Sequence, residues 1–447
     1  MNRPLFQRAS GGLVGHAFVY IAAAAANAAI PFLLLPLIAR WLGPADFGVI
    51  GSFVAVVNVL ILLVGLNAYG FVSIGYYRDG AQTLPRLVGA AITIILTASA
   101  VVGMAGWIGA GVIERLAQID RGWLWTLLAA ATGQAIVAVG LAVAQTIRRP
   151  IIYGALQIGY GLSLAILAVV LVGVIGMGWP GRALAQALAA LTVAAGALAW
   201  LRATGRITAA IDGTTLSRAL WFGVPLLPHS FAAVAMGSMD RIALTGSFTP
   251  AVVGQYFLAL QISSVFIAFA AAVNQAWVPW LYERLARNGD AAWAEIGRTV
   301  RIGGALLIVG AAVMALLATP LVLLVGGSSY LPATTPLRIL AFYAAFQAWY
   351  TLMSAFFFYA ERIRLMSALT VSVAILQAGL IAFFVRWGAT GVAIALLGSS
   401  FAAAVTISLV ARRLAARHRL AVVTDPVAEQ AILETHPPVT PTPASRG

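Results

Sequence analysis

Two opposite charges, Asp240 and Arg241, lie side by side in the stretch GSMDRIALTGSF, inside a long apolar run of a chain in which only 9% of residues are charged. Adjacent residues on a helix point about 100° apart, so we expect the two side chains to have separate partners. Asp240 suits a gating ion pair, with Arg40 or Arg338 as its partner. Arg241 suits an anionic ligand, because a guanidinium offers permanently charged, paired donors to phosphate.

Two apolar stretches, residues 13–39 and 217–246, combine prolines with polar side chains. The first holds Pro31 and Pro36 with His16, Asn27 and the adjoining Arg40, and the second holds Pro225 and Pro228 with His229, Asp240 and Arg241. A proline removes a helical hydrogen bond and loosens the preceding turn, so we expect both helices to be interrupted and to line a cavity. His16 and His229 are candidates for proton coupling, since imidazole titrates near neutral pH, or for structural hydrogen bonds.

Amide side chains in apolar stretches are candidates for binding hydroxyl groups, because an amide both donates and accepts hydrogen bonds. They can equally bond to a neighbouring membrane helix. The cargo-binding candidates are Asn27, Asn274 and Gln275 for hydroxyl groups, and Arg40, Arg241 and Arg338 for an anionic group. The sequence contains neither a metal-ligand spacing of His, Asp and Glu nor a G-x-x-x-x-G-K-[ST] loop, so we expect no metal, cofactor or bound ATP.

The elements that position these residues are long apolar blocks, which recur from near residue 13 to near residue 411 in a chain of 447 residues. Blocks of ~20 residues are typical of membrane-spanning helices, whereas barrel strands alternate over ~10 residues. We predict an all-α polytopic membrane protein with about twelve transmembrane helices. Their ranges are 13–39, 47–77, 84–110, 123–146, 151–177, 181–201, 217–246, 250–282, 299–325, 334–359, 363–386 and 390–411.

The positive charges indicate the orientation of these helices. If the N-terminus is cytoplasmic, the inner side holds nineteen arginines and the outer side five, namely Arg40, Arg115, Arg121, Arg182 and Arg386. This bias predicts that both termini are cytoplasmic, and it explains most arginines as topological anchors rather than as a nucleic-acid site. The chain has no cysteine, which excludes disulfides and thiol chemistry.

Two short motifs recur at nearly the same offset. Pro44-Ala45-x-x-Gly48 matches Pro250-Ala251-x-x-Gly254 at an offset of 206, and Gly181-x-Ala183-x-Ala185 matches Gly391-x-Ala393-x-Ala395 at an offset of 210. A repeated unit of six helices enters the membrane twice in the same direction, an arrangement found in alternating-access carriers. We predict one lobe over residues 1–206, a second over 207–419, and a disordered cytoplasmic tail over 420–447.

Several segments, in this order, resemble a known family. They are ARWLGPADFGVIGSF, GVPLLPHSFAAVAMGSMDRIALTGSFTPAVVGQYFLALQIS, NQAWVPWLYERLA, YLPATTPLRILAFYAAF and RWGATGVAIAL, and the resemblance as a whole runs from about residue 10 to residue 412. They resemble the Wzx-type polysaccharide flippases of the multidrug/oligosaccharidyl-lipid/polysaccharide (MOP) superfamily. The resemblance implies two six-helix lobes in a V around a central, often cationic cavity that opens to either face in turn.

The resemblance also implies a function. The cargo would be an oligosaccharide linked to undecaprenyl pyrophosphate, flipped from the cytoplasmic to the periplasmic leaflet of the bacterial inner membrane for O-antigen or exopolysaccharide synthesis. Implied partners are this lipid-linked oligosaccharide, membrane lipid, and the polysaccharide polymerase and chain-length machinery. The protein would not be an enzyme.

Two alternatives stay open. A cation-coupled drug exporter of the same superfamily shares the fold, but exporters that couple through the first lobe commonly use an acidic residue in the first span, and residues 13–39 contain none. A membrane glycosyltransferase or polymerase would need a sizeable outer loop for its catalytic groups, and the predicted outer loops are short.

Overall fold

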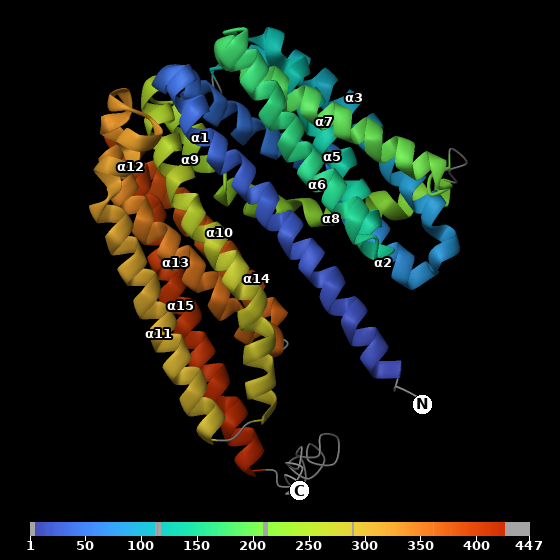
Figure 1. The fold of residues 1–447 in the computed structure, drawn as a ribbon, viewed down its shortest axis with the longest axis vertical. Coiled ribbons are helices and arrows are strands. Elements are labelled where there is room, and N and C mark those ends of the chain that lie inside the picture. The colour runs from blue at the N-terminus through green and yellow to red at the C-terminus, as the bar shows by residue number, and fades with distance from the viewer. Residues whose placement is uncertain are drawn as a thin grey trace, which may run out of the picture.

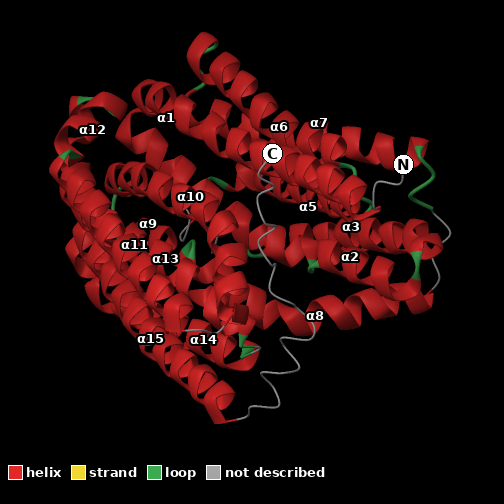
Figure 2. Cartoon of the chain, turned by 60° about the horizontal axis from the view of Figure 1, so that its bottom comes forward, coloured by secondary structure: helices red, strands yellow, loops and turns green. Residues whose placement is uncertain are grey.

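The computed structural model describes the backbone of residues 5–111, 114, 118–208, 213–287, 290–360 and 362–424, and leaves out the side chains of residues 5–28, 31, 229, 233, 363 and 415–424. Every regular element in this described part is helical, as Figure 2 shows, so the predicted all-α class is confirmed. The main helices are α1 Leu5–Gly65, α2 Ala68–Asp79, α3 Leu84–Ile108, α5 Leu124–Thr146, α6 Pro150–Ala168, α7 Gly178–Ala203, α8 Gly213–Met236, α9 Met239–Thr245, α10 Pro250–Arg287, α11 Asp290–Leu316, α12 Ala318–Val325, α13 Thr334–Tyr359, α14 Ile363–Phe384 and α15 Gly388–Thr424.

These helices account for the predicted transmembrane spans. Among the described residues, nine segments are long and apolar enough to cross a membrane, and the bent helix α8 makes a tenth. Two of the nine, Phe32–Asp79 and Arg364–Leu414, are 48 and 51 residues long. Each contains a glycine with positive φ, Gly43 at 68° and Gly388 at 64°, a conformation that breaks a helix. Divided at these two glycines, the described part of the chain contains about twelve spans, as predicted.

The prolines interrupt only one of the two helices in which a break was expected. Helix α8 contains Pro225 and Pro228, and its two halves meet at an angle of 46°. Helix α1 remains helical through Pro31 and Pro36, and its non-helical residue is Gly43. The predicted interruption at the prolines of the first span is therefore wrong. The backbone at Pro31 and Pro36 keeps helical dihedral angles, whereas the positive φ of Gly43 cannot be part of a right-handed helix.

In the described part of the chain, the buried side chains form one core that joins the two halves and three further clusters that lie mostly within one half each. The shared core contains Leu35, Ile38, Phe47 and Phe53 of α1 together with Val253, Tyr256 and Phe257 of α10. One separate core is built from α2, α3, α5 and α7, and another from α10, α11, α13 and α15. The cluster of the first half also includes Ala219 of α8. In Figure 1 the two lobes accordingly meet at one end and diverge toward the other, where α1 begins and α15 ends. We call these the closed end and the terminal end.

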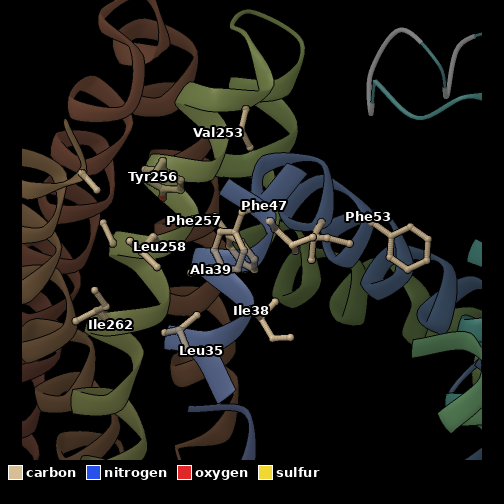
Figure 3. Packing of buried hydrophobic residues seen from close by; sticks show 14 of the residues in the cluster. Leu35, Ile38, Ala39, Phe47, Phe53, Val253, Tyr256, Phe257, Leu258 and Ile262 are labelled. Carbon is tan, nitrogen blue, oxygen red and sulfur yellow. The ribbon is translucent and has the colours of Figure 1, made fainter. Parts of the chain in front are cut away.

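The two copies of the Pro-Ala-x-x-Gly motif meet each other at the closed end. A Cβ atom on Gly48 would lie 1.8 Å from the carbonyl oxygen of Pro250, and a Cβ on Gly254 would lie 1.9 Å from that of Pro44. Each copy therefore packs its glycine on the proline of the other copy, as expected for a two-fold relation between repeats. Beside this crossing Phe47 of α1 lies against Phe257 of α10, with ring centroids 5.1 Å apart (Figure 3).

The end of α15 bears on the predicted tail. The helix continues to Thr424, so the first residues of the predicted disordered segment 420–447 are helical. Residues 425–447 lie outside the described part of the chain. The division into lobes at residue 206 stays a prediction.

Candidate functional site

A cavity of about 260 Å³ lies where the first lobe meets α9 and α10 of the second. Helices α1, α5, α6 and α7 form most of its wall. Its polar lining consists of Asn58, Gln134, Tyr160, Arg182, Gln186, Arg241 and Gln261, and its apolar lining includes Leu35, Ile38, Phe47, Ile50 and Phe257. Seven polar side chains around one space within an apolar bundle mark this cavity as the candidate binding site, because unpaired polar groups in membrane are costly.

Arg241 reaches this cavity from α9, as the sequence predicts, but it is also paired with its neighbour. Its Nε lies 3.5 Å from Oδ1 of Asp240, and the two residues are 6% and 2% exposed. The two charges therefore lie within ion-pair distance, but no hydrogen bond joins Oδ1 of Asp240 to Nε of Arg241. Their hydrogen-bond partners are separate, as the sequence predicts. The helix is broken between Met236 and Met239, and the Arg241 side chain turns back over this break, where its Nη2 also donates to the carbonyl of Gly237.

The second oxygen of Asp240 has its own partner. Its Oδ2 accepts a hydrogen bond of 2.6 Å from the hydroxyl of Tyr256, a fully buried residue of α10. Neither Arg40 nor Arg338, the predicted partners, makes this contact. Asp240 thus holds Arg241 and ties α9 to α10, and a gating role for it stays a prediction.

Arg182 is a second guanidinium at the cavity, and sequence reasoning missed it. It was grouped with the outer topological anchors because its position near the start of a span says nothing of the direction of its side chain. In the structure it lies on the first turns of α7, lines the cavity and donates to Oε1 of Gln186 at 3.4 Å. No carboxylate among the described residues is within ion-pair distance of it, so its charge is open to an anionic ligand.

The remaining polar lining consists of amides and one phenol. Gln134 and Gln186 come from α5 and α7, Gln261 comes from α10, and the Nε2 of Gln134 is buried without a hydrogen-bond partner. Asn58 of α1 adds a further amide to the lining. The signal that could have found the three glutamines is an amide within a strongly apolar helix, a signal that Asn274 and Gln275 of α10 share without lining the cavity.

The charged side chains that line this cavity are all positive. Its described lining contains two arginines and no aspartate or glutamate. Asp240 offsets part of the charge of Arg241 from behind the wall, and Arg182 has only amide and phenol groups around it. In a medium of low dielectric constant such a site attracts anions and repels cations. The amides can in addition bond to hydroxyl groups of a ligand.

The other predicted cargo residues lie away from the cavity. Arg40 is exposed at the closed end, where it donates to the carbonyls of Leu323 and Leu324 at 3.4 and 2.6 Å. Arg338 is exposed and reaches the hydroxyl of Thr319 at 3.5 Å. Asn274 and Gln275 lie on α10 outside the cavity lining, and Oδ1 of Asn274 is buried without a partner. The side chains of His16, Asn27 and His229 fall outside the described part of the structure. Cargo contact by these residues stays a prediction.

Polar contacts between the lobes seal the closed end. The hydroxyl groups of Ser52 and Thr245 are 2.6 Å apart and buried. Gln118 donates to the carbonyl of Thr245 at 2.7 Å, and Tyr330 donates to the carbonyl of Ala39 at 3.1 Å. Arg40 adds the bonds to the last turn of α12, where a cation also meets the negative end of the helix dipole. Each bond joins a residue of the first lobe to one of the second.

Two curated proteins of Haemophilus influenzae have a similar sequence. The lsg locus protein 1 is 23% identical over 278 residues, which are 60% of this chain and 65% of that protein. An uncharacterized membrane protein is 23% identical over 279 residues, which are 61% of this chain and 66% of that protein. The chain thus spans just under two thirds of the length of these relatives.

Solved structures with a similar fold include a lipid II flippase and MATE family transporters of the MOP superfamily. The lipid II flippase MurJ in an inward closed conformation matches with a TM-score of 0.71, at 11% identity, over 96% of this chain and 94% of that one. An inward-facing MATE family multidrug resistance transporter matches with a TM-score of 0.67, at 17% identity, over 89% and 99%. An outward-facing structure of a MATE family transporter gives 0.59, at 17% identity, over 90% and 96%.

The fold is therefore that of a MOP superfamily transporter, with the two lobes that the sequence predicts. The family model described as "Polysaccharide biosynthesis protein" matches residues 37–335, about two thirds of the chain. This match includes α1 from Leu37, the motif glycines Gly48 and Gly254, and both arginines of the cavity. The chain belongs to the polysaccharide biosynthesis protein family.

Proposed function

We propose that this protein is a flippase that carries a lipid-linked oligosaccharide, of the undecaprenyl pyrophosphate type, from the cytoplasmic to the periplasmic leaflet of a bacterial inner membrane. The product would serve the synthesis of a cell-surface polysaccharide. The observation that carries the proposal is the cavity with Arg182 from one lobe, Arg241 from the other, and five neutral polar side chains between them. This lining matches a head group with an anionic phosphate and many hydroxyl groups.

The physical problem of such transport explains this lining. A pyrophosphate and its sugars must pass ~30 Å of hydrocarbon, while the lipid chain can remain in the bilayer. An ion transferred alone into that medium is very unfavourable, so it needs a polar, positively charged path. Arginine gives paired, permanently charged donors for phosphate, and the amides replace water on the hydroxyl groups. Because the two arginines come from different lobes, a cargo phosphate bound to both would bring the lobes closer together.

The orientation follows from the arginine bias, which places both termini in the cytoplasm. The closed end is then periplasmic, and the lobes diverge toward the cytoplasm. The higher TM-score with the inward-facing than with the outward-facing MATE structure supports an inward-facing state. In this state the cargo would load from the cytoplasmic leaflet, and separation of the closed end would then release it on the other side.

The alternatives fit the cavity less well. A drug or cation exporter needs a carboxylate facing its substrate, and the described lining of this cavity carries arginines instead. Asp46, the acidic residue of α1, accepts a hydrogen bond from the backbone N–H of Trp179 at 3.2 Å and does not line the cavity. We propose transport without catalysis, because the solved structures of similar fold are those of transporters and of a lipid flippase.

Substitution of the cavity arginines tests the proposal in cells. A strain that lacks the gene should accumulate lipid-linked oligosaccharide and lose surface polysaccharide. Complementation with Arg182→Gln should restore less than a tenth of wild-type transport, since a hydrogen bond to a charged group contributes about 1.5–3 kcal/mol. Arg202→Gln, at the exposed end of α7 and outside the cavity, serves as the matched control and should complement fully.

Arg241 needs a further control because of its pairing. Arg241→Gln leaves Asp240 buried without its partner, which can destabilise a protein by about 3–5 kcal/mol. The double variant Asp240→Asn/Arg241→Gln removes both charges and should restore expression but not transport. Wild-type polysaccharide in the Arg182→Gln strain, or in the double variant, would contradict a cargo role for that arginine.

A further inference from the structure

A second pocket, of about 300 Å³, lies between α2 and the first half of α8, at the terminal end of the first lobe. Figure 2 shows α8 running alongside α2. The pocket is lined by Phe71, Ile74, Gly75, Arg78, Arg218, Trp221 and Phe222. It shares no residue with the cavity that contains Arg182 and Arg241, and the proposed transport function does not use it.

The charged half of this pocket has an excess positive charge. Arg218 of α8 contacts Oδ2 of Asp79 at 2.5 Å, and Nε of Arg78 contacts Oδ1 of the same carboxylate at 3.2 Å. Two guanidinium groups thus share one carboxylate. Each guanidinium has five N–H donors, so donors remain for a further anion. A net charge of about +1 suits a phosphodiester, which carries one negative charge.

The other half of the pocket is apolar and faces outward. Phe71 and Phe222 have ring centroids 6.1 Å apart and form its floor. Ile74 and Trp221 are 53% and 76% exposed. A tryptophan exposed beside arginines at the end of a membrane span is typical of the level of the lipid head groups. The pocket therefore fits one molecule that has an anionic head and an apolar chain.

We propose that this pocket binds an anionic phospholipid of the leaflet at the terminal end of the protein. Its phosphate would lie between Arg78 and Arg218, and one acyl chain would follow Ile74 and Trp221. Helix α2 belongs to the first lobe and α8 opens the second, so the bound lipid would fasten α8 to the first lobe. A soluble phosphate ion would make the ionic contacts with the two arginines. Because it has no acyl chain, it would lack the apolar contacts with Ile74 and Trp221.

Fluorescence quenching tests this proposal on the purified full-length protein. Phosphatidylglycerol with brominated chains should quench Trp221 at lower concentration than phosphatidylcholine with the same chains. The difference between wild type and Trp221→Phe isolates this signal from that of the other tryptophans. Each of Arg78→Gln and Arg218→Gln should weaken phosphatidylglycerol binding on the order of fivefold, the effect expected of one basic residue at a membrane surface. Arg202→Gln should leave it unchanged.

Asp79→Asn gives the most specific result. If the phosphate competes with Asp79 for the two arginines, removal of the carboxylate should strengthen phosphatidylglycerol binding. A purely structural ion-pair cluster would instead bind no lipid and only lose stability. Because Asp79→Asn keeps both arginines, it tests the proposal even where Arg218→Gln does not fold.

Four results would overturn the proposal. They are equal quenching by the two lipids, unchanged phosphatidylglycerol binding in Arg78→Gln/Arg218→Gln, displacement of the lipid by millimolar inorganic phosphate, and displacement by a polyprenyl diphosphate at far lower concentration than phosphatidylglycerol. The third would identify a site for soluble phosphate, and the fourth an entry point for cargo. Because this binding assay requires no flipping, its outcome is independent of the proposed function.

Discussion

Gly48→Ala or Gly254→Ala should abolish transport while leaving the protein folded in the membrane. In each case the new Cβ would lie within 2 Å of a backbone carbonyl oxygen of the other lobe, at 1.8 Å from Pro250 and 1.9 Å from Pro44. A backbone atom cannot rotate away as a flexible side chain can, so α1 and α10 must separate. The substitution thus disfavours the state in which the closed end is sealed, and the carrier cannot return to load cargo.

Labelling of an introduced cysteine measures this separation. The chain contains no cysteine, so Thr245→Cys is a single reactive site, and Thr245 is 1% exposed at the closed end. A membrane-impermeant maleimide should react slowly with Thr245→Cys alone and rapidly when Gly48→Ala is added. Gly196→Ala is the control: it also replaces a helical glycine, but its Cβ meets nothing within 4 Å. It should keep transport and stabilise the helix by about 0.5–1 kcal/mol. Normal transport by both motif variants would contradict the role given to this crossing.

A disulfide between positions 52 and 245 should lock the closed end and stop transport reversibly. The side-chain oxygens of Ser52 and Thr245 are 2.6 Å apart, which is near the sulfur–sulfur distance of a disulfide, about 2.05 Å. Oxidation of Ser52→Cys/Thr245→Cys should block transport completely, because release of cargo requires α1 to leave α9. Reduction should restore it.

The two single-cysteine variants control for this experiment. Each loses the buried hydrogen bond, worth about 0.5–1.5 kcal/mol, but cannot form the cross-link. Both should transport under oxidising conditions. Full transport by a cross-linked double variant would mean that the lobes do not separate at this position.

Hydrophobic patterning alone could predict the helices, since twelve apolar blocks bounded by glycine, proline and arginine admit few other folds in a membrane. The duplicated motif also carried structural information, because its two glycines turn out to pack on each other's prolines. The pattern could not show which of the candidate helix-breaking residues interrupts a helix in the folded protein. Pro31 and Pro36 read as an interruption, yet α1 passes through them and breaks at Gly43.

The site was harder to predict because charge and position along a span do not determine where a side chain points. Arg241 was identified by its apolar surroundings, and it does line the cavity. Arg182 has the same chemistry but lies near a span end, where arginines usually serve as anchors. Arg40 was expected in the cavity and instead bonds to the end of α12. Whether each of these arginines lines the cavity depends on how six helices pack around it, and the sequence does not show this packing.

The pairing of Asp240 with Arg241 shows the same limit. The 100° between neighbouring positions assumes an unbroken helix and short side chains. Both residues lie on α9, but the Arg241 side chain is long enough for its Nε to come within 3.5 Å of Oδ1 of Asp240. The sequence showed two charges in an apolar run, whereas the hydrogen-bond partners of each, the hydroxyl of Tyr256 and the carbonyl of Gly237, are properties of the tertiary structure.

The most direct test of the central claim is transport of a lipid-linked oligosaccharide by the purified protein in liposomes. The cargo is placed in both leaflets, and the sugar exposed outside is measured over time with a membrane-impermeant oxidant. We predict that wild type exposes all of the sugar and that Arg182→Gln and oxidised Ser52→Cys/Thr245→Cys expose only the outer half. Exposure equal to that of protein-free liposomes in the wild type, or equal exposure in all three proteins, would contradict the account.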